Sequence, residues 1–292
     1  MVQTTVAIPT RTLVTGMVHD DGTIVSAEVY AVAEACGQSA DQVRSCLRRL
    51  AAEGLVERRT GSGRTAVYAA TPEGLATVGA TIERTRLAYV QDAAGRGWDR
   101  NWHLVAFAVP ERTRRSRDGF RDRLLALGGA PVQGGLYVSP HQWHKDVRVA
   151  AEQFDIFDAV TLISTDDLGV GGERDPRVIA ARLWPLDAIA ARYTTFVDRY
   201  DWMLPALEDM RTRRERLPDA SFLPGALAMG VEFAEVFNVD PLLPPELLPR
   251  PWPGRTAREL VLRCRRLALK LRQGPGRPAL FHNFDEAIDA IT

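Results

Sequence analysis

The chain is poor in several features that would assign it to a special class. It has three cysteines in 292 residues and no Cys-x-x-Cys spacing, so Cys36, Cys46 and Cys264 are expected to be buried free thiols. It has no run of 18 apolar residues and no basic segment followed by a long apolar one at its start. We therefore expect a soluble, cytoplasmic protein with no membrane contact.

Net charge is also missing, because 37 Lys and Arg residues balance 37 Asp and Glu residues. With no net charge, the protein as a whole has no positive field that would indicate nucleic-acid binding. Any evidence for such binding must come from where the charges lie along the chain. Residues 39–64 carry six arginines against three acids, and residues 250–278 carry nine basic residues against one acid. Positive charge is therefore concentrated in these two segments.

The ordinary 46 % of hydrophobic and 25 % of charged residues predict two or three packed domains.

Three helices are predicted near the start of the chain. The first covers residues 10–19, and the second runs from Ser26, as its N-cap, to residue 35. The third begins at Ser39, where Gln42 completes a Ser-x-x-Gln capping box, and it ends before Gly54. Its apolar residues recur at helical spacing and define the buried side: Val43, Leu47 and Leu50.

A hairpin and a fourth helix follow the third helix. Residues 55–59 and 65–70 are typical of strands, and residues 60–64 (TGSGR) of the turn between them. Thr71-Pro72 is a typical start for the next helix. The order helix, helix, helix, hairpin, helix predicts an N-terminal winged helix-turn-helix.

A second domain begins after Gly95-Arg96-Gly97. Its pattern is strand, helix, strand, helix, strand at residues 102–109, 112–127, 131–138, 143–154 and 159–164. This order favours a ferredoxin-like α+β sandwich, with one short strand or hairpin partner left unassigned.

The remainder is predicted to be all-α, with helices at 188–208, 223–237 and 256–271. The proline-rich residues 241–249 cannot form a helix interior and are expected to be a rigid connector on the surface. The predicted fold class is thus multidomain α+β, with domains at 1–95, 96–175 and 176–292.

The third helix is the best candidate for contact with DNA. Arginine suits a bidentate contact with guanine and glutamine one with adenine, whereas serine and a helix N-terminus suit phosphate. A basic residue at the hairpin tip would reach a neighbouring phosphate or minor groove. Alternatively, Gln42 only caps the helix and the arginines form a solvated face. The candidate DNA-binding residues are Ser39, Gln42, Arg44, Ser45, Arg48 and Arg64.

Catalysis is not indicated by any motif. The chain has no G-x-S-x-G, G-x-x-x-x-G-K-[ST], G-x-G-x-x-G or H-E-x-x-H sequence. His141, His144 and Asp146 could supply metal ligands, but no fourth partner is in view, and they are interpreted as ordinary surface or core-edge residues. We expect no enzyme activity, no cofactor and no metal.

A weaker pattern mixes arginines with aromatic residues in the third domain. Such a mixture could line a pocket for an aromatic acyl or anionic ligand. The alternative is that the arginine-rich helix at 258–272 is a solvated face. The candidate effector-binding residues are Arg192, Tyr193, Tyr200, Trp252, Arg255 and Arg258.

Nearly the whole chain resembles the PaaX family of bacterial transcriptional regulators. The resemblance rests on residues 42–74 (QVRSCLRRLAAEGLVERRTGSGRTAVYAATPEG), 101–140 (NWHLVAFAVPERTRRSRDGFRDRLLALGGAPVQGGLYVSP), 182–200 (RLWPLDAIAARYTTFVDRY) and 240–260 (DPLLPPELLPRPWPGRTAREL). The last segment is the most specific, because a proline-rich turn that ends in Trp-Pro-Gly and continues to Ala-Arg is hard to obtain by chance.

The resemblance implies a winged helix, a central domain similar to the CRISPR Cas2 fold, and a helical C-terminal domain. Proteins of this kind are dimeric repressors that leave a double-stranded DNA operator on binding a small effector, in the best-known case phenylacetyl-CoA. Arg44, Ser45 and Arg48 fall in the family's recognition helix and Arg64 in its wing. The family often has a small polar residue where this chain has Arg48, so a different operator is expected.

Three functions follow as hypotheses. The first is a dimeric repressor of a catabolic operon, released by an effector such as an aryl-acyl-CoA. The second is a Cas2-like metal-dependent nuclease, although catalytic Cas2 proteins keep an Asp at the end of their first strand and residues 105–111 (VAFAVPE) contain none. The third is a non-catalytic interaction scaffold. In the first, the central domain would join two subunits and set two wings about 34–36 Å apart.

Overall fold

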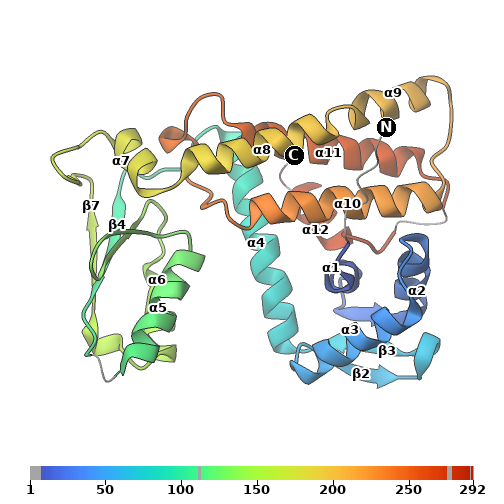
Figure 1. Ribbon diagram of the computed structural model, residues 1–292, viewed down its shortest axis with the longest axis horizontal. Helices are drawn as coiled ribbons and strands as arrows, with labels where there is room; N and C mark the ends of the chain where they lie inside the picture. The colour runs from blue at the N-terminus through green and yellow to red at the C-terminus, as the bar shows by residue number, and fades with distance from the viewer. Residues whose placement is uncertain (1–7, 111–112, 275–277, 290, 292) are drawn as a thin grey trace. The chain divides into compact units, whose positions relative to one another are not determined.

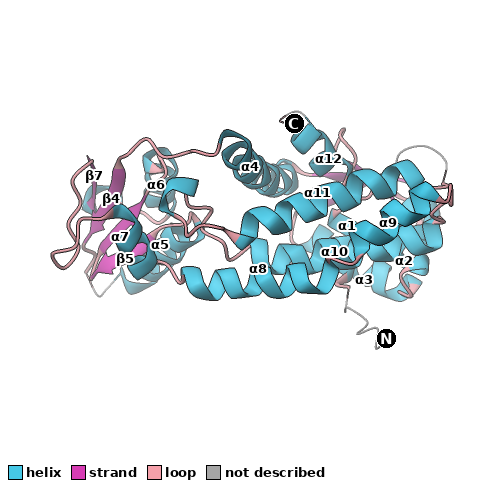
Figure 2. Cartoon of the chain, turned by 90° about the horizontal axis from the view of Figure 1, so that it is seen from above, coloured by secondary structure: helices cyan, strands magenta, loops and turns pink. Residues whose placement is uncertain are grey.

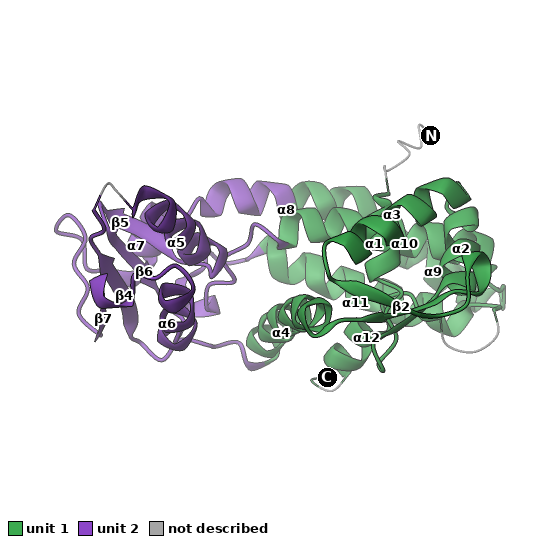
Figure 3. Ribbon diagram, turned by 90° about the horizontal axis from the view of Figure 1, so that it is seen from below, with its two compact units in different colours: residues 1–93, 193–237, 253–292 green, residues 94–192, 238–252 purple. Residues whose placement is uncertain are grey.

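The computed structural model describes residues 8–110, 113–274, 278–289 and 291. Contacts within the chain divide it into two compact units, which Figure 3 shows in different colours. The first comprises residues 1–93, 193–237 and 253–292, and the second comprises residues 94–192 and 238–252. The three domains at 1–95, 96–175 and 176–292 remain a prediction about organisation along the sequence. In space, both ends of the chain contribute to the first unit.

The first unit opens with the predicted order of elements (Figure 1). They are α1 (Thr10–Thr15), β1 (Thr23–Val25), α2 (Ser26–Ala35), α3 (Ala40–Ala52), β2 (Val56–Thr60), the 3-10 turn η1 (Gly63–Thr65), β3 (Val67–Ala70) and α4 (Pro72–Ala94). The three strands form an antiparallel sheet of order β1-β3-β2, with Ile24 opposite Tyr68 and Glu57 opposite Ala69. The first helix ends at Thr15, four residues before the predicted end.

Local capping explains where α3 and α4 begin. The Ser39 hydroxyl accepts the Gln42 backbone N–H at 3.3 Å, and the Gln42 side chain accepts the Ser39 N–H at 2.7 Å, so the predicted capping box is confirmed. The Thr71 hydroxyl accepts the Gly74 N–H at 3.1 Å. The prediction for Ser26 was wrong, because Val25 is the N-cap of α2 and Ser26 is the first helical residue.

The other helices of the first unit come from the C-terminal part of the chain. They are α8 (Leu186–Tyr200), whose first residues belong to the second unit, α9 (Met203–Thr212), α10 (Asp219–Phe237), α11 (Pro253–Leu271) and α12 (His282–Asp289). The helix predicted at 188–208 is therefore two helices, interrupted at Asp201-Trp202. Figure 2 shows the helical character of this part of the chain.

One hydrophobic core joins the N-terminal helices to α10. Val43, Leu47 and Leu50 of α3 are buried as predicted. They belong to the same cluster as side chains from α1 and α2, four residues of α10 and one residue before α12: Phe222, Leu223, Leu227, Val231 and Leu280. Among the described residues, α10 is the one helix long and apolar enough to cross a membrane, with a mean hydropathy of 1.3. Seven of its residues are buried, and four of these belong to the core just described.

The second unit is a four-stranded antiparallel sheet, and two of its helices share a hydrophobic core with two of its strands. Its elements are β4 (Trp102–Phe107), α5 (Arg114–Ala126), β5 (Ala130–Gln133), β6 (Leu136–Ser139), α6 (His144–Gln153), the 3-10 turn η3 (Phe157–Ala159), β7 (Val160–Thr165), α7 (Pro176–Leu183) and the 3-10 turn η4 (Pro245–Leu247). The strand order β5-β6-β4-β7 is that of a ferredoxin-like fold. Residue 112, where a helix was predicted to begin, lies outside the described residues.

Two predictions for this unit need correction. The single strand expected at 131–138 is the hairpin of β5 and β6, and it supplies the strand that was left unassigned. The proline-rich segment 241–249 is not a surface connector, because its leucines are buried: Leu242, Leu243, Leu247 and Leu248. The Glu246 carboxylate accepts the Gly97 N–H at 3.1 Å, and the Glu246 carbonyl accepts from Arg177 Nε at 2.9 Å. The segment therefore packs into the second unit.

Candidate nucleic-acid interface

Helix α3 presents a basic face next to its buried face. Arg44 and Arg48 lie one helical turn apart, both exposed, and Ser45 between them is half-buried. The buried side of the helix is fixed by Val43 and Leu47 in the core. The core therefore determines which side of α3 carries these arginines.

Ser39 and Gln42 are both engaged at the start of α3. Each side chain accepts a backbone N–H of the other residue, as described for the capping box. The structure thus gives these two side chains the capping role. Gln42 caps through its Oε1 atom, so the N–H donors of its Nε2 atom take no part in the cap. Their role in binding DNA remains a prediction.

Arg44 is held by two neighbours. Its guanidinium forms an exposed ion pair with Asp41, one turn earlier on α3. The hydrogen bond and charge of Asp41 raise the pKa of Arg44, with a smaller contribution from the Tyr30 hydroxyl. Because exposed ion pairs contribute little to stability, the arginine can exchange Asp41 for a phosphate or a base at low cost.

Arg64 lies on the same tyrosine. The turn η1 carries Arg64, and its guanidinium carbon lies 5.3 Å from the centre of the Tyr30 ring, a cation–π distance. Tyr30 is a buried residue of α2, and the smaller pKa contribution just described places its hydroxyl beside Arg44. The Tyr30 ring therefore lies near both α3, the predicted recognition helix, and η1, the predicted wing.

The turn that carries Arg64 depends on Gly61. This residue has a φ of +68°, and a Cβ atom placed on it would lie 2.3 Å from the Thr65 carbonyl oxygen. Only glycine can occupy this position without moving the backbone. The hairpin therefore has a fixed shape that sets the position of η1.

Sequence reasoning missed three further residues of this face. Tyr30 is the one aromatic residue of α2, and its burial hid its contact with two arginines. Arg58 and Arg59 are exposed on β2, which forms the edge of the three-stranded sheet. Arg59 pairs with Glu57 at 3.0 Å. The strong local excess of arginine at residues 39–64 was the signal that could have included them.

The six candidate effector residues fall in both units. Tyr193, Tyr200, Arg255 and Arg258 belong to the first unit, and Arg192 and Trp252 belong to the second. Tyr193, Tyr200, Trp252 and Arg258 are buried, whereas Arg192 and Arg255 are exposed. Burial and the Glu232 carboxylate raise the pKa of Tyr200. The role of these six residues in binding an effector remains a prediction.

Helix α11 is only in part the solvated face that its sequence suggested. Three arginines recur every seven residues along α11 and just past its end. Their side chains are at most 12 % exposed and pair with carboxylates: Arg258 with Asp92, Arg265 with Asp285, and Arg272 with Asp219. Arg265 and Arg272 also lie over the Phe222 ring, at 5.3 and 5.7 Å. Arg263 is exposed, as predicted, and Arg266 is half-buried. The seven-residue spacing was a signal for the buried stripe.

The three cysteines are free thiols, as predicted. Cys46 and Cys264 are buried, whereas Cys36 is only half-buried.

His141, His144 and Asp146, which were considered as metal ligands in the sequence, lie in the second unit. The ring of His144 packs edge-on against the ring of His103, with 5.3 Å between the ring centres. Burial is the main cause that lowers the pKa of His144.

Two models of known protein families match the chain. A family model described as the PaaX protein central Cas2-like domain matches residues 95–179, and one described as the PaaX-like protein C-terminal domain matches residues 184–274. Neither model includes the segment before residue 95.

Two relatives cover most of the chain. The transcriptional repressor PaaX of Escherichia coli K12 is 26 % identical over 244 residues, which is 84 % of this chain and 74 % of the relative. The solved structure of the uncharacterized protein Rv0674 from Mycobacterium tuberculosis has a TM-score of 0.57 at 20 % identity, covers 90 % of this chain and 97 % of its own, and so shares the fold. The ferredoxin-like second unit thus coincides with a Cas2-like domain, and the chain belongs to the PaaX family.

Proposed function

We propose that the chain is a DNA-binding transcriptional regulator, and that it acts as a repressor. The relative from Escherichia coli is a transcriptional repressor. The observation that carries the proposal for this chain is the position of Tyr30, whose ring centre lies 5.3 Å from the Arg64 guanidinium carbon and whose hydroxyl, after Asp41, contributes to the raised pKa of Arg44. A basic turn and a basic helix near one buried ring suit the simultaneous contact of a neighbouring phosphate and a groove.

In the proposed complex the first unit binds as a winged helix. Helix α3 enters the major groove with Arg44 and Arg48 toward base edges, and the N-terminus of α3 with Ser39, Gln42 and Ser45 faces phosphates. Arg64, at the hairpin tip, contacts an adjacent phosphate. The exposed Arg58 and Arg59 of β2 add positive charge to this part of the chain.

The regulator is proposed to work as a cytoplasmic homodimer that leaves its operator when a small effector binds. Support for a dimer comes from the edge strand β7 of the second unit, on which Ile163 is 46 % exposed. The proposed effector class is an aryl-acyl-CoA such as phenylacetyl-CoA, and the proposed target is an operon of aromatic catabolism. These finer assignments rest on the resemblance to the family.

No observation favours a nuclease or a scaffold over a regulator. The first strand of the Cas2-like domain, β4, has the sequence WHLVAF and contains no carboxylate. A metal-dependent nuclease of this type would need one there. An interaction scaffold would not need to bind DNA, whereas a regulator would. Measuring DNA binding therefore separates the two hypotheses.

The test is fluorescence-anisotropy titration of the purified protein with DNA from upstream of its own gene, against a scrambled fragment, over a range of salt. Each titration is repeated with phenylacetyl-CoA. The triple variant Arg44→Ala, Arg48→Ala, Arg64→Ala is compared with Arg263→Ala, an exposed arginine of α11. We expect selective, salt-dependent binding that the triple variant loses, that Arg263→Ala keeps and that the thioester releases.

Each other outcome has a distinct meaning. Selective binding that the thioester does not change would keep the regulator and discard the effector class. Binding that the triple variant retains would remove α3 and the hairpin from the interface. Failure to prefer any fragment in a genome-wide binding search would contradict the regulator and favour the scaffold.

A further inference from the structure

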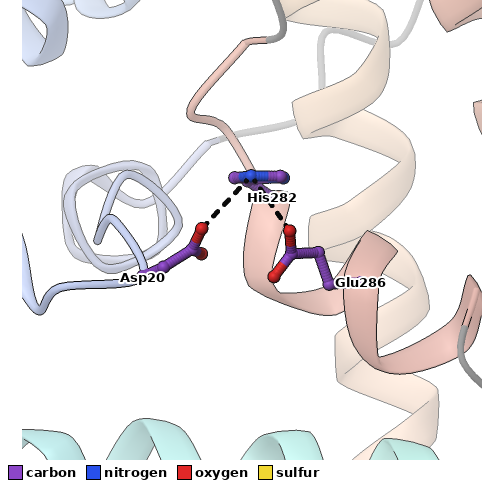
Figure 4. A group of neighbouring side chains, drawn as sticks. All are labelled: Asp20, His282 and Glu286. Atoms are coloured by element: carbon purple, nitrogen blue, oxygen red, sulfur yellow. Dashed lines mark ion pairs between the residues drawn. The ribbon is translucent and has the colours of Figure 1, made fainter.

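Three potential metal ligands meet in the first unit (Figure 4). Asp20 lies in the turn between α1 and β1, and His282 and Glu286 lie on α12. The Nε2 atom of His282 is 3.4 Å from Asp20 Oδ2 and 3.5 Å from Glu286 Oε1. One ligand atom of each residue lies within 4.8 Å of the other two.

The backbone brings these residues together independently of their charges. His282 and Glu286 are four residues apart, so they share one face of α12. On either side of His282, the Phe281 N–H donates to the Gly16 carbonyl at 2.7 Å, and the Asn283 side chain donates to the Val18 carbonyl at 2.9 Å. The start of α12 is thereby fixed to the segment that leads to Asp20, and the three ligands are preorganised.

The distances differ from those of a hydrogen-bonded histidine. A separation of 3.4 or 3.5 Å is longer than an ordinary N–H···O bond of about 2.7–3.2 Å. Nε2 also carries at most one proton and faces two carboxylates. An ion with bonds of about 2.0–2.2 Å in tetrahedral geometry sets its ligand atoms about 3.3–3.5 Å apart, and the two nitrogen–oxygen separations have that length.

The ligand atoms, one imidazole nitrogen and two carboxylate oxygens, determine which metal ion suits the site. Calcium and magnesium prefer sites made of oxygen alone, whereas zinc accepts imidazole nitrogen together with carboxylate oxygen. The His282 side chain is 19 % exposed, and the two carboxylates are about half exposed, so an ion can enter from solvent. Two carboxylates also balance the charge of a divalent ion.

We propose that Asp20, His282 and Glu286 bind one Zn²⁺ ion, with water in the fourth position. The ion joins the C-terminal helix to the turn before β1, and the proposal is independent of the function proposed above. Among the described residues, no hydrogen-bond partner reaches His282 Nδ1. Sites that lack this outer partner bind metal about 10–100-fold more weakly, so we expect moderate affinity.

The test measures zinc binding by the full chain, stripped with a chelator, in competition with a chromophoric chelator. The matched control is His19→Gln, because His19 is the residue before Asp20 and its Nε2 contacts Glu28 instead, at 2.7 Å. We expect one equivalent of zinc on the wild type and on His19→Gln. His282→Gln should abolish binding, and Asp20→Asn and Glu286→Gln should each weaken it by about tenfold or more.

Two further readouts keep the proposal falsifiable if one variant folds poorly. Zinc, but not magnesium or calcium, should raise the melting temperature of the wild type, and at the same zinc concentration it should raise that of Glu286→Gln, whose carboxylate is exposed, by less. Co²⁺ in the same site should give the visible absorption of tetrahedral coordination. Less than one equivalent of zinc on the wild type, or equal binding by His19→Gln and all three site variants, would overturn the assignment.

Discussion

Arg258 and Asp92 form a two-point ion pair, with Nε to Oδ2 at 2.5 Å and Nη2 to Oδ1 at 2.9 Å. Their side chains are 5 % and 17 % exposed. The pair joins α11 to α4, and the Tyr89 hydroxyl donates to the Arg258 carbonyl at 3.1 Å beside it. An anionic effector that uses Arg258 must therefore compete with a carboxylate that already neutralises it.

Replacing Asp92 by Asn should destabilise the first unit by about 3–5 kcal/mol, because it leaves a buried guanidinium without its balancing charge. The measurement is urea unfolding followed by circular dichroism. The control is Glu208→Gln, whose partner Arg263 lies 3.5 Å away with both side chains about half exposed, and it should cost less than about 1 kcal/mol. Equal losses in the two variants would contradict a structural role for the buried pair.

Replacing Arg44 by Ala should weaken operator binding by roughly 5- to 150-fold if this arginine reads a base. It should also relax sequence preference at one position of the operator. Anisotropy titration against single-base variants of the operator measures both effects, with Arg263→Ala as the control. Unchanged affinity and preference would remove Arg44 from the interface.

Replacing Arg64 by Ala should reduce the slope of log affinity against log salt by about one, because one phosphate contact is lost. Sequence preference should stay the same, unlike the result expected for Arg44. The experiment is the same titration at several salt concentrations. A slope equal to that of the wild type would place Arg64 away from the backbone of the DNA.

Replacing Gly61 by Ala should distort the hairpin, because the new Cβ would meet the Thr65 carbonyl oxygen and the residue has a positive φ. We expect weaker DNA binding with a loss of stability of about 1–3 kcal/mol. Gly63→Ala is the matched control, since Gly63 also has a positive φ but open space around it. If Gly61→Ala bound DNA as well as Gly63→Ala, the shape of the turn would not matter for binding.

The buried thiols should be inert in the native protein. Burial raises the pKa of Cys264 to about 11, and burial also raises the pKa of Cys46 and Cys36. Because a raised pKa lowers the thiolate fraction, only about one Cys264 in a thousand is reactive at pH 8. A thiol reagent at pH 8 should label half-buried Cys36 first and all three only after denaturation. Rapid native labelling of Cys264 would contradict its burial.

The sequence predicted those elements whose signals are local. The capping box of Ser39 and Gln42, the periodicity of α3 and the Thr71-Pro72 start of α4 each lie within a few residues. The hairpin of β5 and β6 also had a local signal, Gly134-Gly135, but the apolar residues on both sides of it suggested one continuous strand. The exposed arginines of α3 could be predicted because the buried face of a helix defines the opposite face.

What the sequence did not predict are contacts between distant segments. Arg258 and Asp92 are 166 positions apart, and nothing near either residue indicates the other. The contact of Tyr30 with Arg64 depends on how a turn packs on a helix, and the meeting of Asp20 with His282 depends on how the last helix packs near the first. Such pairings follow from tertiary packing, which periodicity and capping do not encode.

The core shared by α1, α2, α3 and α10 has a consequence for synthesis of the chain. A ribosome releases the predicted DNA-binding helices first, but Phe222, Leu223, Leu227, Val231 and Leu280, which complete their core, emerge much later. The Cas2-like domain between them has its own core, formed by residues 105–156, and that core can fold meanwhile. The helices that we propose to bind the operator must therefore wait for nearly the whole chain before their hydrophobic face is covered, so a truncated chain would expose that face rather than act as a small repressor.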